Sequence, residues 1–108
     1  MMASDPLAPF FTTPVVVERR TGNGAAGPTF APPVTLLGWV VNERRLVLGG
    51  DGEEIESAAR VSLPATTPAI PVGSRVRLPD DRVATVLTEQ RREGGPAFLP
   101  HYYSVDLT

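Results

Sequence analysis

The stretch LVLGGDGEEIESAARVSLP, residues 46–64, decides the fold of this chain. It begins apolar, passes through a turn rich in glycine and aspartate, and returns as an alternating segment. On the return, one side carries Ile55, Ser57, Ala59, Val61 and Leu63. A period of two is typical of a half-buried β-strand and not of a helix. Because glycine accepts positive φ in the turn GGDG, the stretch predicts a β-hairpin. Its tip is acidic, with Asp51, Glu53 and Glu54.

Composition sets the class of protein. The 108 residues suffice for one small domain, and the 12 prolines and 10 glycines argue against long helices. The net charge of -2 lacks the basic excess that is usual in nucleic-acid binders. Without cysteine, disulfides and thiolate metal sites are excluded. No apolar run reaches the roughly 20 residues that span a bilayer, so we expect assembly in a cytoplasm and no membrane partner.

The N-terminal residues 1–13 predict an extended arm, because Pro6 and Pro9 disfavour a helix. Phe10 and Phe11 follow without any periodic context. The arm is either a frayed terminus or a segment whose phenylalanines dock on a neighbouring subunit, since adjacent exposed rings are costly in water. A first strand is expected over residues 14–20, followed by a long irregular loop over 21–33 that is rich in glycine and proline.

Residues 34–41, VTLLGWVV, predict a strand that is apolar on both faces. Such a strand is either central and covered on both sides, or covered on one side by a partner chain. Trp39 is accordingly a core residue or an interface anchor. Further strands are expected over 75–78, 82–92 and 101–108, with a tight turn at 79–81. The fold class is therefore all-β: residues 14–108 form a small antiparallel barrel or sandwich of six or seven strands with a projecting hairpin.

Residues suited to catalysis or metal binding do not cluster in the sequence. His101 is the one histidine, and no serine stands in a nucleophile-elbow context. The carboxylates of the hairpin tip lack the spacing of a calcium loop. Arginine pairs at 19–20, 44–45 and 91–92 are either phosphate contacts or solvated strand ends and ion-pair partners. The sequence predicts no catalytic residue, no cofactor-binding or metal-binding residue, and no enzymatic activity.

The order of the segments resembles the head-to-tail stopper, or head-closure, proteins of long-tailed (siphovirus-type) bacteriophages, especially those of high-GC actinobacterial hosts. The resemblance covers the chain from Val15 onward. It is carried by the order of VERR (17–20), GPTFAPPV (27–34), GGDGEEIESAARVSLP (49–64), PVGSRVRLPDDRVATVL (71–87) and FLPHYYSVDL (98–107).

This resemblance implies a structural virion protein of the phage neck. It implies a ring, usually a dodecamer, below the portal and adaptor proteins and above a tail-completion or tail-terminator protein. Packaged DNA would pass through the ring without sequence-specific binding. The position matching the loop that projects into the DNA channel is Gly49, Gly50, Asp51, Gly52, Glu53 and Glu54. Candidates for the contact between subunits are Phe10, Phe11 and Trp39.

Two other interpretations of the sequence stay open. A tail-completion or tail-terminator protein of the same neck would have similar size and strand content. A free-standing β-barrel that binds nucleic acid or a peptide is the second alternative. The net charge and the lack of aromatic residues interleaved with basic ones count against nucleic-acid binding.

Overall fold

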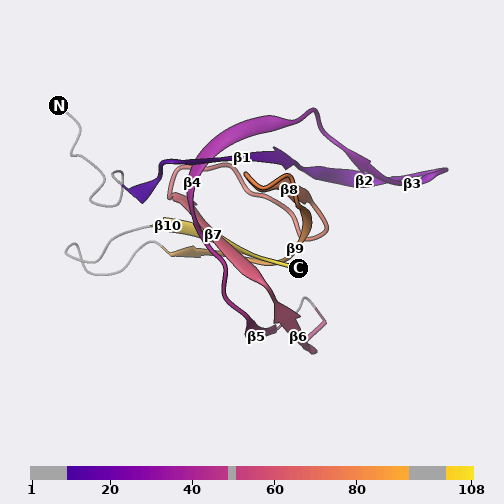
Figure 1. The fold of residues 1–108 in the computed structure, drawn as a ribbon. Helices are drawn as coiled ribbons and strands as arrows, with labels where there is room; N and C mark the ends of the chain where they lie inside the picture. Colours follow the sequence, from indigo (N-terminus) through magenta and orange to yellow (C-terminus); the bar gives the residue numbers. More distant parts are fainter. Residues whose placement is uncertain (1–9, 49–50, 93–101) are drawn as a thin grey trace.

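Six antiparallel strands close into a barrel in the order β1-β4-β7-β10-β9-β8 (Figure 1). The computed structural model describes residues 10–48, 51–92 and 102–108. The barrel strands are β1 (Thr13–Glu18), β4 (Val34–Val41), β7 (Ala59–Pro64), β8 (Arg75–Arg77), β9 (Val83–Arg92) and β10 (Tyr102–Leu107). The predicted all-β fold is confirmed, and of the two architectures expected it is the barrel.

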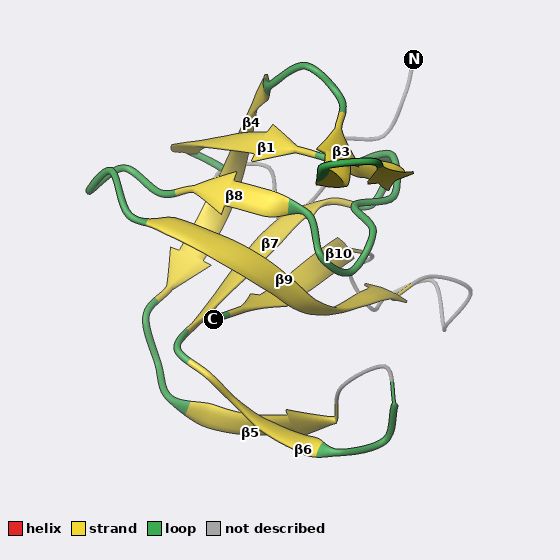
Figure 2. Ribbon diagram, turned by 90° about the vertical axis from the view of Figure 1, so that its right-hand side faces the viewer, coloured by secondary structure: helices red, strands yellow, loops and turns green. Residues whose placement is uncertain are grey.

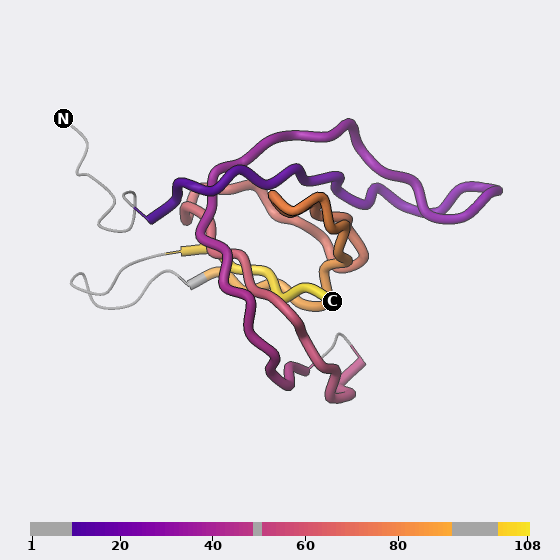
Figure 3. The backbone as a smooth tube through the Cα atoms, in the orientation of Figure 1, coloured from indigo at the N-terminus to yellow at the C-terminus, as the bar shows by residue number. Residues whose placement is uncertain are grey.

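Two further pairs of strands form ribbons outside the barrel. They are β2 (Arg20–Gly24) with β3 (Gly27–Phe30), and β5 (Arg45–Leu48) with β6 (Glu54–Ser57). In Figure 1 the two ribbons leave the barrel in different directions, β2–β3 to the right and β5–β6 downward. The tube in Figure 3 shows the same two excursions of the backbone away from the barrel.

The prediction of an irregular loop over residues 21–33 is wrong, because most of this segment forms the β2–β3 ribbon. Glycine and proline are poor strand formers, so the sequence pattern gave no indication of these two strands. The hydroxyls of Thr21 and Thr29 lie 2.8 Å apart across the two strands. Gly27 leaves the turn at φ +113°, a conformation that favours glycine.

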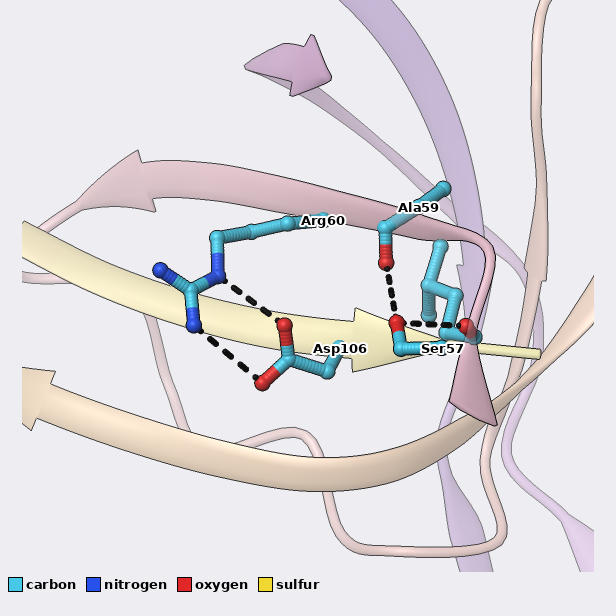
Figure 4. Close-up of polar contacts among 5 residues, drawn as sticks. Ser57, Ala59, Arg60 and Asp106 are labelled. Carbon is cyan, nitrogen blue, oxygen red and sulfur yellow. Dashed lines mark hydrogen bonds and ion pairs between the residues drawn. The ribbon is translucent and has the colours of Figure 1, made fainter. Parts of the chain in front are cut away.

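The decisive stretch 46–64 divides between a ribbon and the barrel. Its first part pairs β5 with β6, and its last part is β7, which pairs with β4 and β10. The division falls at Ala58, whose N–H donates to the carbonyl of Leu107 at 3.0 Å. Beside it the Ser57 hydroxyl lies 3.0 Å from the Ala59 carbonyl and 2.9 Å from that of Leu107 (Figure 4). The base of the ribbon is thereby fixed to β10.

The interior of the barrel is filled by alternating side chains from every strand, as expected for a barrel of this size. The buried core consists of Val15, Val17, Ala59, Val61, Leu63, Ile70, Val76, Leu78, Ala84, Val86, Tyr103, Val105 and Leu107. The expected alternation of the final strand is confirmed, with Tyr103, Val105 and Leu107 inward. The predicted turn at 79–81 is also confirmed: the Asp80 carboxylate accepts from the N–H of Arg82 at 3.1 Å.

Candidate functional site

The polar side chains buried in the described residues are used by the fold. None of their nitrogen or oxygen atoms lacks a hydrogen-bond partner. The Ser74 hydroxyl accepts from the N–H of Arg20 at 2.9 Å, and the Thr67 hydroxyl donates to the carbonyl of Pro64 at 2.6 Å. Across the same described residues, no group of three or more His, Cys, Asp or Glu side chains is placed to hold a metal ion. His101 lies outside the described residues.

A surface hollow of about 280 Å³ lies at one end of the barrel. It is lined by Thr13, Val40, Asn42, Leu78, Pro79 and Asp80. Its carboxylate, Asp80, already accepts a hydrogen bond from the turn that it closes. The hollow therefore brings together no nucleophile, base and orienting group of the kind that catalysis requires.

The outer face of β4 is apolar and open to solvent. The inward residues of this strand, Leu36 and Val40, pack against the core. On the other face Trp39 is 44% exposed and Leu37 is 55% exposed. Trp39 is therefore not a core residue of this chain, and β4 is not covered on both sides by the described residues. Its role as an interface anchor stays a prediction.

The two adjacent phenylalanines differ in burial. Phe10 is 51% exposed and stacks on Trp39, with ring centroids 5.2 Å apart and an interplanar angle of 22°. Phe11 is 7% exposed, because its side chain is buried in its own chain. The expected contact between subunits thus remains available to Phe10 and Trp39 and not to Phe11. The first strand begins at Thr13, one residue earlier than expected, and residues 1–9 of the predicted arm lie outside the described residues.

The tip of the β5–β6 ribbon carries the residues predicted to face a channel. Asp51, Gly52, Glu53 and Glu54 are all exposed, and Gly49 and Gly50 lie outside the described residues. The Asp51 carboxylate accepts from the N–H of Glu53 at 3.1 Å. Gly52 has φ +85°, so the turn requires glycine at this position. The acidic tip is a defined turn whose carboxylates point to solvent.

The two faces of the β5–β6 ribbon differ in chemistry. Leu46 pairs with Glu56 and Leu48 with Glu54, so these four side chains share one face. Both leucines are about two-thirds exposed, at 67% and 66%. Glu56 lies 3.5 Å from the guanidinium of Arg44, an exposed pair of little energetic weight. This face, called the leucine–glutamate face below, is an apolar strip bordered by carboxylates.

An exposed arginine, Arg77, lies on the wall of the barrel that β1, β8 and β9 form. In register across β1, β8 and β9, Arg77 lies between Val16 and Val83 on the outer face. Within the part of the chain that the structure describes, the guanidinium of Arg77 makes no hydrogen bond and no ion pair. Its neighbour Arg75 differs, because it pairs with Glu18 at 3.4 Å and stacks over the ring of Phe30 at 3.8 Å. The surface of Val16, Arg77 and Val83 is called the arginine face below.

Other arginines hold the connector between β7 and β8 against the barrel. Arg19 donates to the carbonyls of Ala69 at 3.0 Å and Pro68 at 3.1 Å. Arg91 donates to the carbonyls of Ala65 and Thr67 and lies over the ring of Tyr103. These roles were missed in the sequence, because adjacent arginines give no signal that distinguishes a structural contact from a phosphate contact.

A partly buried ion pair lies on the outer side of β7 and β10. The guanidinium Nε of Arg60 donates to Oδ1 of Asp106 at 2.9 Å, and Nη2 lies 3.4 Å from Oδ2 (Figure 4). The two residues are direct partners in the strand register. Both groups are largely covered, so the pair serves the sheet and not a solvent-facing site.

The comparisons with known proteins add no family. No protein-family model, no curated protein and no solved structure matches the chain. Within the described residues, no helix is long and apolar enough to cross a membrane.

Proposed function

We propose that this chain is a structural protein of the virion neck of a long-tailed phage, a head-to-tail stopper. In this proposal, copies form a ring below the portal and adaptor that helps to close the DNA channel and offers a surface for tail attachment. The proposal rests on the resemblance described above. The observation that carries it further is the open apolar surface around Trp39.

That surface is more than a small monomeric barrel needs to leave exposed. Phe10, Leu37 and Trp39 are all large and about half exposed, and the first and last of them stack. Contiguous apolar patches on a soluble protein usually mark a contact with another chain. The buried polar side-chain atoms of the described residues all have hydrogen-bond partners within the fold. Assembly is therefore the activity for which these residues are best suited.

The main alternative is a tail-completion or tail-terminator protein of the same neck. The two proposals differ in position, next to the adaptor or next to the tail tube. A free-standing binding barrel is a weaker alternative, because the hollow beside Asp80 offers few convergent polar groups.

The test is to remove the protein from a phage that encodes it and to examine the particles by electron microscopy. A stopper predicts heads that package DNA and then lose it, without tails. A tail terminator instead predicts stable full heads beside unattached tails. Normal infectious particles formed without this chain would refute both the stopper and the tail-terminator assignment.

A second measurement tests the apolar surface itself. Trp39→Ser should give folded protein that fails to restore particles, while Thr35→Ser, on the same exposed face of β4, should restore them. If both variants restored particles equally, the apolar surface around Trp39 would not support the proposal.

A further inference from the structure

The leucine–glutamate face is left uncovered by the described residues of its own chain. A two-stranded ribbon is marginally stable in water unless another element covers it. Among residues 10–48, 51–92 and 102–108, no other strand pairs with the β5–β6 ribbon. Figures 1 and 2 both show it standing apart from the barrel walls. Leu46 and Leu48, together with Glu54, whose carboxylate has no ion-pair partner among the described residues, therefore form a surface suited to a partner that is apolar and positively charged.

The arginine face has the complementary chemistry. Val83 is 51% exposed and Val16 is half-buried. Arg77 lies between them in the strand register, and no carboxylate of the described residues pairs with its guanidinium. A guanidinium beside apolar side chains favours a carboxylate, because it can donate two parallel hydrogen bonds. This face therefore suits an apolar strip that carries an acid.

We infer that the leucine–glutamate face of one copy docks on the arginine face of a second copy. Leu46 and Leu48 would cover Val16 and Val83, and Glu54 would pair with Arg77. In Figure 2 the ribbon lies below the barrel while β8 lies on the upper wall, so one copy does not satisfy both faces by itself.

The contact joins two different surfaces, so it is heterologous and generates a ring or a filament and not a closed pair. This inference rests on the proposed function in one respect: if copies of the chain form a ring, it names the two surfaces that meet between neighbours. The ribbon's end, from Asp51 to Glu53, extends past the leucines and stays free in this arrangement.

The experiment measures self-association of the full chain by analytical ultracentrifugation, at low and high salt. Glu54→Arg and Arg77→Glu should each weaken association by about tenfold or more, because each places like charges in contact. An equimolar mixture of the two variants should restore it. One kind of junction then has the native charges, and the other has them exchanged.

Matched controls separate this contact from net charge. Glu43→Arg and Arg45→Glu make the same charge changes at exposed residues outside the two faces, and they should leave association unchanged. Leu48→Thr, which keeps a good strand former, should weaken it at both salt concentrations. Circular dichroism melting checks that every variant is folded.

Several outcomes would overturn the inference. They are a wild-type chain that stays monomeric at every concentration, a reversed variant that associates normally, a mixture that does not recover, or controls that weaken association equally. Failure here leaves the neck assignment standing if the chain is still required for tailed particles. Conversely, the contact can hold in a protein that no virion contains, so the two failures are distinguishable.

Discussion

The hydroxyl of Tyr103 lies 2.7 Å from the backbone nitrogen of Ile70 and accepts its hydrogen bond. The same hydroxyl is 3.3 Å from the Ile70 carbonyl, to which it donates. One side chain of β10 thus satisfies both backbone groups of a connector residue whose own side chain is buried in the core. These two hydrogen bonds hold the proline-rich connector between β7 and β8 against the barrel.

Tyr103→Phe should lower the free energy of unfolding by about 1–3 kcal/mol, because the buried N–H of Ile70 loses its acceptor. The ring remains, so the contact with the Arg91 guanidinium, 4.5 Å from the ring centroid, is kept. Urea denaturation measures the change. Hydrogen exchange of the Ile70 amide should accelerate more than that of Val105, and equal acceleration would contradict a local role.

Tyr103 also predicts a loss of stability at high pH. Burial is the main reason that the pKa of its hydroxyl is raised above the usual value near 10. In the unfolded chain the hydroxyl ionises first, so the folded state holds more protons as the pH rises past 10. The stability that Tyr103 contributes is therefore fully present below pH about 10 and is lost above it. The difference in unfolding free energy between wild type and Tyr103→Phe should shrink from pH 8 to pH 11.

At Gly38, β4 passes so close to β7 that a side chain would not fit. A Cβ atom there would lie 2.8 Å from Cδ2 of Leu63 and 2.9 Å from the carbonyl oxygen of Ser62. Because a paired backbone cannot move aside cheaply, Gly38→Ala should destabilise the barrel by about 1–3 kcal/mol. Thermal melting with Thr35→Ala as control tests this, since Thr35 faces solvent on the same strand. Equal melting temperatures for the two variants would contradict the close approach.

Alternation along the chain predicted most of the barrel, because inward and outward residues of its strands differ in polarity. It did not predict the division at Ala58. The same side of the stretch stays buried from Ser57 to Leu63 while the pairing partner changes from β5 to β4 and β10. A change of partner leaves no trace in a pattern that records only which side is buried.

The surface was harder to predict than the core. Phe10 and Phe11 are identical neighbours, and only the path of the chain buries Phe11 and leaves Phe10 half exposed against Trp39. Arg75 and Arg77 lie two residues apart on one strand. The guanidinium of Arg75 pairs with Glu18, whereas that of Arg77 pairs with no carboxylate in the described part of the chain. Such differences depend on contacts between strands distant in sequence, which composition and spacing do not encode.

The carboxylates at the ribbon tip give the last prediction. If the tip faces the bore of a ring, each copy adds Asp51 and Glu53 to a lining of the same sign as the DNA backbone. Single interactions are screened beyond about 10 Å at 0.1 M salt, but the copies add and a narrow bore focuses their field. Such a lining would keep DNA from adhering during passage.

Asp51→Asn with Glu53→Arg tests this lining while keeping the turn, because the Asn side chain still offers an oxygen to the N–H of residue 53. Glu54 is left unchanged, since it belongs to the leucine–glutamate face. Particles with the double variant should assemble but eject DNA more slowly, and the defect should diminish at high salt. Glu43→Arg, which alters an exposed carboxylate away from the tip, should eject normally. Normal ejection by the double variant would mean that the tip does not face the channel.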